Sequence, residues 1–355
     1  NGRYLSAGKV TFTVYPDCMA FAGRNFRSVY FTSLVVFLLP IALLFASPVL
    51  SRSNISDSLL PQIHAVHLFS DPIVSSDSTS VIPFTRAGNL ILIQARADSI
   101  VGNFILDTGA PNLVLNMTYF RSYSTINSSD QEQTGLSGSA SNRIQIQIDE
   151  FSFGNIKYNR VEADLTNLGQ IENSKGVKIL GLLGIQLFRQ FELIIDYEKS
   201  LIYLHLISKK EAKTYKSELL NDTSAYSVIP FDITDNKIIT KLEIGGKKLR
   251  FIIDCGAETN LLDSRLPNNI FENVEIGRRV ILRGADDKKT EALYGNLKNM
   301  KIGNQQVSSL PILITNLQKS CLSYISCTDG ILGFDFLSLH KIGFNFVKRK
   351  MYIWK

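Results

Sequence analysis

Two aspartates, Asp107 and Asp254, each follow an apolar run and open the same short motif. The surrounding stretches read "FILDTGAPNLVLN" and "FIIDCGAETNLLD". Two carboxylates held close together resist being ionised at once, so one keeps a proton while the other is charged. Such a pair can hold a water, deprotonate it for attack on a carbonyl, and protonate the product oxygen and the leaving nitrogen. These two acids are therefore the candidate catalytic residues.

The motif occurs twice because the whole unit around it is duplicated. "VIPF" begins at Val81 and again at Val228, 147 positions later, and the two acids have the same separation. "GLLG" at Gly181 and "GILG" at Gly330 repeat with an offset of 149. A tandem duplication of about 125 residues follows from this self-similarity. Two repeats are too few for a solenoid, so we predict a two-lobed globule with a pseudo-twofold axis.

The elements that position the acids are predicted to be nearly all β. Each acid ends the second strand of a hairpin, and in the second unit the strands 237–244 and 248–254 flank a Gly-Gly turn. Gly109 and Gly256 are expected to allow the sharp turn after each acid, since glycine tolerates positive φ and close backbone approach. Another hairpin follows through Gly154-Asn155. A short helical stretch comes after each G-x-L-G, then a closing hairpin in each unit, and residues 208–224 read as a solvated helix plus loop.

The N-terminal region has a different composition. Residues 31–50 are about twenty mostly apolar residues without a charge, preceded by Arg24 and Arg27 and followed by a plausible cleavage site at Val49-Leu50-Ser51. This layout is that of an export signal, with an uncleaved membrane anchor as the alternative. Residues 52–80, rich in Ser and Asp, read as a flexible tether or a short pro-segment.

The charge distribution, the cysteines and the histidines predict few further binding or catalytic sites. The net charge is +6, without a basic stripe interleaved with aromatics, so a nucleic-acid partner is not expected. Cys321 and Cys327 form a small-loop disulfide if the protein is exported, or else remain two reduced cysteines. The four histidines show no spacing that suggests a triad or a metal, and no His-Cys cluster completes four zinc ligands. Neither a metal nor a cofactor is therefore expected.

The two motifs, each followed by an apolar-apolar-Gly strand, resemble those of the aspartic peptidases. The Ala after the Gly and the short units are most similar to the retropepsin branch, and the resemblance covers about Val81 to Lys355. It implies an all-β, bilobal double-barrel fold with one short helix per lobe, with both lobes in one chain and thus a monomer. The catalytic dyad would be Asp107 and Asp254. The loops that support it would hold Thr108, Gly109, Ala110, Cys255, Gly256 and Ala257.

The same resemblance implies further parts. The strands at Leu182-Leu183-Gly184 and Ile331-Leu332-Gly333 would cross behind the acid loops. Glycine-containing hairpin flaps would close over a peptide or protein substrate, and the candidates contain Gly135, Gly138 and Gly284. Cys255, which replaces Thr, would be a tolerated substitute without thiol chemistry of its own.

The implied function is that of an exported aspartic endopeptidase, which is either free or membrane-anchored by residues 31–50. The alternative is a catalytically weak or inactive peptide-binding module that keeps the fold. The predicted organisation is an extension with signal or anchor (1–51), the tether or pro-segment (52–80), the first lobe (81–207), a linker (208–224) and the second lobe (225–355).

Overall fold

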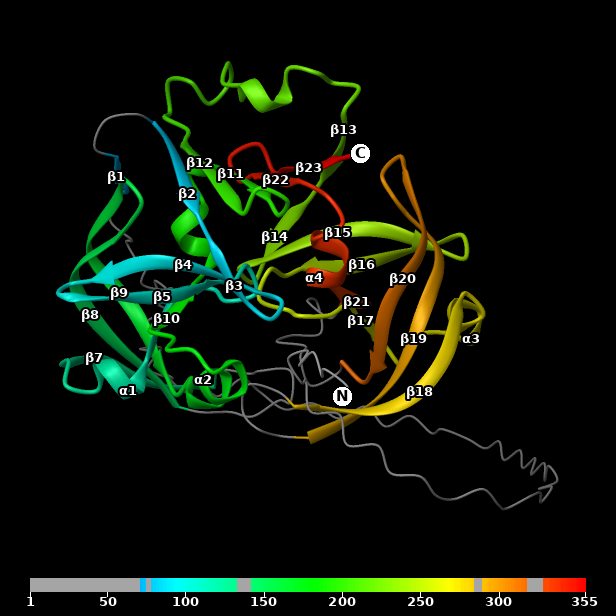
Figure 1. Ribbon diagram of the computed structural model, residues 1–355, viewed down its shortest axis with the longest axis horizontal. Coiled ribbons are helices and arrows are strands. Elements are labelled where there is room, and N and C mark those ends of the chain that lie inside the picture. Colours follow the sequence, from blue (N-terminus) through cyan, green and yellow to red (C-terminus); the bar gives the residue numbers. More distant parts are fainter. Residues whose placement is uncertain (1–70, 75–77, 133–141, 284–288, 318–327) are drawn as a thin grey trace, which may run out of the picture. The chain divides into compact units, whose positions relative to one another are not determined.

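The computed structural model describes residues 71–74, 78–132, 142–283, 289–317 and 328–355 (Figure 1). These residues form three β-sheets joined by short helices and turns. One sheet belongs to each lobe, and the third is shared by both lobes. The all-β, two-lobed fold that the sequence predicts is confirmed.

The first lobe is built on a nine-stranded sheet in the order β1-β9-β6-β10-β5-β4-β8-β7, with β3 paired to β4. Strand β10 runs parallel to β5 and antiparallel to β6, so it crosses between them. The strands are β1 (Ile73–Val74), β3 (Thr85–Ala87), β4 (Leu90–Ala97), β5 (Ile100–Leu106), β6 (Leu113–Asn116), β7 (Thr125–Glu132), β8 (Asn142–Phe153), β9 (Ile156–Thr166) and β10 (Gly181–Leu183).

The second lobe repeats this topology in an eight-stranded sheet, ordered β14-β15-β16-β21-β17-β20-β19-β18. The run β20-β17-β21-β16-β15 matches β9-β6-β10-β5-β4 strand for strand, as the sequence duplication requires. The strands are β14 (Asp232–Thr234), β15 (Lys237–Ile244), β16 (Lys247–Ile253), β17 (Leu261–Asp263), β18 (Val274–Arg283), β19 (Lys289–Ile302), β20 (Gln305–Thr315) and β21 (Gly330–Leu332).

The third sheet joins the lobes, because each lobe contributes three of its six strands. Its order is β13-β23-β22-β11-β12-β2, and the lobes meet where β11 pairs antiparallel with β22. We call it the central sheet. Its strands are β2 (Thr79–Pro83), β11 (Phe191–Asp196), β12 (Leu201–Leu206), β13 (Tyr226–Pro230), β22 (Ile342–Asn345) and β23 (Lys350–Trp354).

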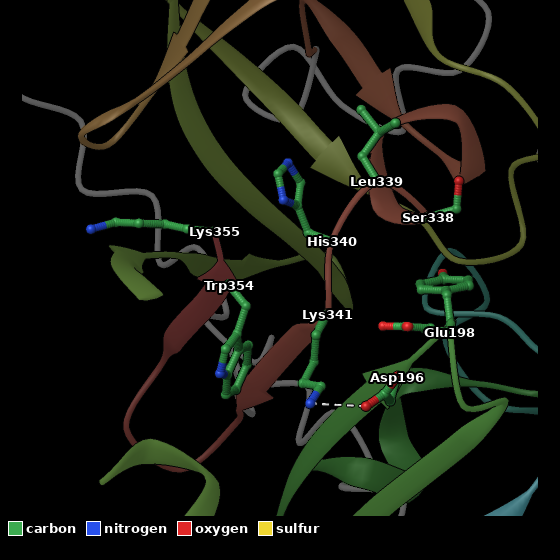
Figure 2. A pocket seen from close by; sticks show the side chains of 9 residues that line it. Asp196, Glu198, Ser338, Leu339, His340, Lys341, Trp354 and Lys355 are labelled. Carbon is green, nitrogen blue, oxygen red and sulfur yellow. Dashed lines mark ion pairs between the residues drawn. The ribbon is translucent and has the colours of Figure 1, made fainter. Parts of the chain in front are cut away.

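Two polar pairs lie on the β11–β22 seam of the central sheet, each with a buried carboxylate. Asn345 donates a 2.8 Å hydrogen bond to Glu192, and the Lys341 ammonium lies 2.9 Å from the Asp196 carboxylate. Figure 2 shows the second pair in a pocket of about 300 Å³ whose wall includes Trp354. Because Glu192 and Lys341 are 149 positions apart, the two pairs occupy equivalent places across the pseudo-twofold axis.

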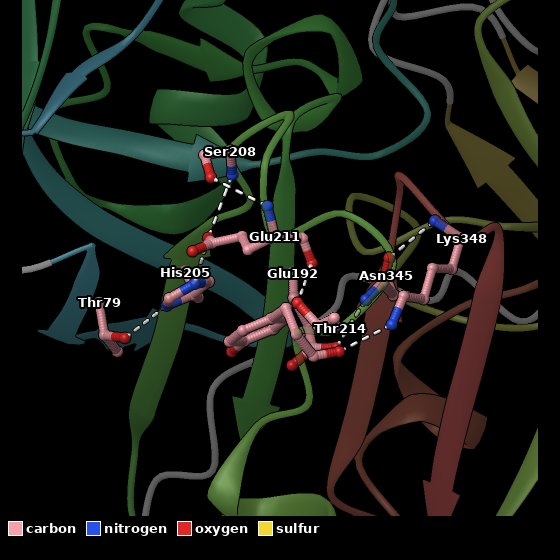
Figure 3. A network of polar contacts seen from close by, with 9 residues as sticks. Thr79, Glu192, His205, Ser208, Glu211, Thr214, Asn345 and Lys348 are labelled. Atoms are coloured by element: carbon pink, nitrogen blue, oxygen red, sulfur yellow. Dashed lines mark hydrogen bonds and ion pairs between the residues drawn. The ribbon is translucent and has the colours of Figure 1, made fainter.

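A polar network continues from this seam on the β12 side (Figure 3). The His205 ring lies 2.7 Å from the Thr79 hydroxyl and 3.1 Å from the Glu211 carboxylate, and it stacks on Tyr215. Glu211 also accepts a 3.1 Å hydrogen bond from the Ser208 backbone. The network therefore fastens the start of the 208–224 linker to strands β2 and β12.

The helices are all short. They are α1 (Met117–Phe120), α2 (Gly169–Lys175), α3 (Asn268–Phe271) and α4 (Phe334–Leu337), with the 3₁₀ helices η1 (Ile185–Phe188) and η2 (Glu218–Leu220). The short helices expected after each G-x-L-G are present as η1 and α4, whereas the sequence pattern did not predict α1, α2 and α3. In the described part of the chain, none of the helices has the length and apolar character needed to cross a membrane.

The prediction of a helix in the 208–224 linker is wrong. Residues 209–214 form turns, and only η2 is helical. The backbone N–H groups of Ser208 and Glu211 each donate to the other residue's side chain, as at the start of a helix, but the segment lacks an apolar face that packing could use to extend it.

The core is continuous between the lobes. One buried cluster includes Phe104 and Phe188 from the first lobe and Phe251 and Phe346 from the second. The Phe188 and Phe346 rings stack with centroids 6.4 Å apart, so aromatic contact supplements the strand pairing at the seam. The two acid loops therefore rest on a shared apolar base.

Candidate active site

Each acid stands at the end of a buried strand that is held from behind. Strands β5 and β16 end one residue before Asp107 and Asp254, respectively. The backbone N–H of Asp107 donates to Leu183 O at 3.1 Å, and that of Asp254 donates to Leu332 O at 3.0 Å. Strands β10 and β21, which the resemblance placed behind the acid loops, therefore fix the point where each loop begins.

The backbone of each loop turns back onto its own carboxylate. Asp107 Oδ1 accepts hydrogen bonds from the N–H groups of Gly109 at 2.8 Å and Ala110 at 3.1 Å. Asp254 Oδ1 accepts one from Gly256 at 2.8 Å, and the Ala257 N–H also bonds this carboxylate. Such donors favour the charged form of a carboxyl group and hold its plane in place.

The two loops meet so closely that the glycines face the opposite acids. A Cβ on Gly109 would lie 2.4 Å from Asp254 Oδ2, and a Cβ on Gly256 would lie 2.5 Å from Asp107 Oδ1. Neither glycine adopts a positive φ; in this respect the expectation from the sequence is wrong. Close approach of the opposite carboxylate, and not the shape of the turn, excludes a side chain at these two positions.

A buried hydroxyl links the loops underneath the acids. Thr108 donates a 3.0 Å hydrogen bond to Ile253 O and accepts one of 3.0 Å from the Cys255 backbone N–H. Both of these loop residues are buried, and the Cys255 thiol lies beside the Thr108 hydroxyl. Burial raises the pKa of this thiol to about 12, with a further rise from the two acids, so the thiol stays protonated near neutral pH.

The two carboxyl groups titrate as a pair. Burial raises the pKa of Asp107 well above its ordinary value, and the neighbouring charge of Asp254 raises it further. Burial also raises the pKa of Asp254, but hydrogen bonds from Gly256 and Asp107 and the charge of Lys237 counter the rise. A pair of this kind keeps one proton over a wide pH range, because the second ionisation would place two negative charges side by side.

Two glycines that follow the crossing strands allow the close packing behind the acids. A Cβ on Gly184 would lie 2.0 Å from Asn112 O, and one on Gly333 would lie 2.4 Å from Ala257 O. The next residues, Ile185 and Phe334, donate backbone hydrogen bonds of 2.9 and 2.8 Å to the acid loops. The helices η1 and α4 thus begin against these loops.

Reciprocal contacts between the lobes flank the acids. In one, Asn89 of the β3–β4 turn donates to Glu258 O at 3.0 Å, and Lys175 forms an ion pair with the Glu258 carboxylate. In the other, Asn236 of the β14–β15 turn accepts hydrogen bonds from Gln186 at 2.7 Å and Arg189 at 2.6 Å. Each turn is therefore fastened to the opposite lobe.

Sequence reasoning did not find these contacts, nor Lys237, whose charge acts on the acids. The aligned repeats do contain this difference, because Lys237 and Leu90 each stand 17 positions before the acid of their own repeat. The candidate flap residues Gly135, Gly138 and Gly284 lie outside the described residues, between β7 and β8 and between β18 and β19. Cys321 and Cys327 also lie outside the described residues.

Comparison with known protein families gives a match in each lobe. A family model described as aspartyl protease matches residues 93–187 and again residues 240–336, which together make up more than half of the chain. Each matched segment contains one acid with its loop and its crossing strand. None of the curated proteins matches the chain. The chain therefore belongs to the aspartyl protease family, as a retropepsin-like member with two lobes in one chain.

Proposed function

We propose that the protein is an aspartic endopeptidase, which cleaves peptide bonds with a water activated by Asp107 and Asp254. The observation that supports this most is the close facing of the two acid loops, in which a Cβ on either loop glycine would collide with the opposite carboxylate. One protonated and one charged carboxyl group can hold a water between them, take its proton, and protonate the carbonyl oxygen that the water attacks.

The pH profile of cleavage follows from the raised pKa values. Activity rises with pH as the first carboxyl group ionises, and it falls once the pH passes the higher pKa, because the proton donor is then lost. Since burial raises the pKa of both acids, and that of Asp107 to about 8, we expect a bell-shaped profile that extends to neutral pH.

The expected substrates carry bulky apolar residues on both sides of the cleaved bond. Each lobe has a small apolar cluster next to its acid loop, which includes Leu90 in the first lobe and Ile331 in the second, with Ala257 packed against it. Apolar side chains of a peptide would be removed from water against such surfaces.

The test is incubation of the purified chain with a diverse peptide library from pH 3 to pH 9. Asp107→Asn and Asp254→Asn should each lower kcat/KM by about a thousandfold while the fold is retained, since one carboxyl group cannot serve as both acid and base. Asp232→Asn, on the exposed strand β14, is the matched control and should keep full activity. Absence of cleavage at every pH in a folded sample would favour the inactive peptide-binding module instead.

We further propose that residues 31–50 direct export of the protein or anchor it in a membrane. The uncharged apolar run after two arginines supports this proposal. Mass spectrometry of the N-terminus after expression in a secreting host distinguishes the two outcomes. A new N-terminus near Ser51 would indicate a cleaved signal, and an intact chain in the membrane fraction would indicate an anchor. An intact chain in the cytosol would contradict both.

A further inference from the structure

The strand register places different residues opposite the two acids. Strands β15 and β16 pair with Ile238 opposite Ile253, so the next position puts Lys237 opposite Asp254. In the first lobe, β4 and β5 pair with Leu92 opposite Ile105, and continuing this register by two positions puts Leu90 opposite Asp107. Residues opposite each other in an antiparallel pair project to the same face of the sheet. A cation therefore accompanies one acid, and a buried leucine accompanies the other.

The environment of Lys237 differs from that of an ordinary surface lysine. Its side chain is half-buried, and burial lowers its pKa, whereas Asp254, Asp235 and Asp107, in that order, raise it. Its charge in turn lowers the pKa of Asp254. The main influences on the pKa of Asp107 are burial and Asp254, and the apolar Leu90 opposite it offers no compensating charge.

The backbone next to Lys237 is fixed to both lobes. Asp235 and Asn236 form the β14–β15 turn with φ angles of 49° and 57°, in the left-handed region that such a tight hairpin requires. The Asn236 side chain accepts the hydrogen bonds from Gln186 and Arg189 of the first lobe. The equivalent turn of the first lobe is also fastened to the opposite lobe, through the hydrogen bond that Asn89 donates to Glu258 O, so both turns are anchored, whereas the charge at Lys237 has no counterpart at Leu90.

We propose that Lys237 is a positioning residue of the dyad, which holds Asp254 as the ionised member and leaves the shared proton on Asp107. This proposal rests on the function proposed above. Asp254 would then take a proton from the water as the water oxygen bonds to the carbonyl carbon. Asp107 would give its proton to the carbonyl oxygen, so that a neutral gem-diol forms and the dyad as a whole keeps one proton and one charge.

The other ionisable groups around the dyad do not duplicate this role. The Cys255 thiol and the Tyr197 phenol have pKa values raised by burial, so both are neutral in the working range. Arg86 acts on Tyr197 and lies over the Phe334 ring, and Asp235 acts on Lys237. Within the described part of the chain, Lys237 is the cation recorded as acting on Asp254.

A carboxyl titration of the full chain tests the proposal without requiring cleavage. With ¹³C-labelled aspartate, the Asp107→Asn and Asp254→Asn variants assign the two dyad signals. In the wild type, the Asp254 signal should titrate at the lower pH. In Lys237→Met this lower transition should move up by about one pH unit, since removal of a cation that acts on a carboxyl group raises its pKa by that order. Lys237→Arg should restore it, and Lys241→Met, exposed on the same strand, should leave it unchanged.

Peptidase kinetics give the second measurement. The acidic limb of the kcat/KM profile should move up by about one pH unit in Lys237→Met and return in Lys237→Arg. Lys237→Gln serves as a second neutral variant if the methionine disturbs folding. An unchanged lower transition in a folded neutral variant, or a wild type in which Asp107 ionises first, would overturn the proposal. A wild type that cleaves nothing while its dyad titrates as expected would instead contradict the proposed function alone.

Discussion

Gly109 has no room for a side chain, because the carboxyl group of the opposite acid occupies the space where its Cβ would lie. A Cβ there would lie 2.4 Å from Asp254 Oδ2, which is too close for unbonded atoms. Gly109→Ala should therefore push the carboxylates apart and lower kcat/KM by about a hundredfold, as expected for a displacement on the order of 1 Å at a reacting group. The measurement is steady-state cleavage of one peptide found in the library.

Gly277→Ala is the matched control for this change. It lies on strand β18, does not adopt a positive φ, and its added Cβ would make an ordinary 3.4 Å contact with Tyr294 O. The control should keep its activity. Full activity in a folded Gly109→Ala protein would mean that the two carboxyl groups need not face each other as closely as the structure has them.

Cys255 allows a second test at the residue scale, because Thr108 holds the equivalent place and makes two hydrogen bonds across the loops. A thiol is a weaker donor than a hydroxyl group. Cys255→Thr should therefore keep or raise both kcat/KM and the melting temperature, with a gain in unfolding free energy of about 1 kcal/mol at most. Cleavage assays and thermal denaturation measure the two quantities. Lost activity in a folded Cys255→Thr protein would assign the thiol a role of its own.

At the scale of elements, the seam of the central sheet depends on the pair of Lys341 with Asp196. Burial alone would raise the pKa of Asp196, but the hydrogen bonds and charges of Lys341 and Lys199 together outweigh it and lower the pKa, with the larger part from Lys341. Lys341→Met would leave this buried carboxylate without its cation, at a cost of about 3 kcal/mol of unfolding free energy. Urea denaturation at neutral pH measures this loss, and the exposed Lys350→Met on β23 should show almost none.

The pH dependence of this loss in unfolding free energy shows whether the ion pair causes it. A carboxyl group with a lowered pKa in the folded state stabilises the fold above its unfolded pKa, and this contribution is lost as the pH falls through the folded pKa. The difference between Lys341→Met and the wild type should therefore shrink below about pH 4, the ordinary range of an aspartate. A difference of equal size at pH 3 and pH 7 would mean that lost packing, and not the ion pair, causes the change.

The hairpins were predictable because alternation and turn residues are local signals. The predicted strand 237–244 is β15 itself, and Gly245 and Gly246 both adopt the positive φ expected of their turn. The helix α2 was missed because its boundary signals are weak, with Leu168 at its N-cap making no side-chain bond. Lys175, the last residue of α2, contacts Glu258, which is 83 positions away in the sequence. Local sequence patterns do not show such a contact.

At the scale of the whole molecule, the duplication made the close approach of the two acids predictable, whereas the differences between the repeats were harder to interpret. An acid that occurs at equivalent places in two units can contact its own copy only near the pseudo-twofold axis. Lys237 breaks that symmetry, but its importance becomes visible only when the strand register, continued by one position, puts it opposite Asp254. What the repeats share thus indicates the fold, and what they do not share indicates how the two acids differ.

The last prediction concerns assembly, because both halves of the dyad belong to one chain. Strands β11 and β22 pair through four residues each, and the cluster that contains Phe188 and Phe346 buries the contact. The acids are therefore brought together by folding and not by association of two chains, so the active species should be a monomer. Specific activity should stay constant when the enzyme is diluted about a thousandfold, and sedimentation should give one species near the 39.7 kDa of the chain. Activity that falls steeply on dilution, in step with loss of a dimer, would show that a second copy completes the site.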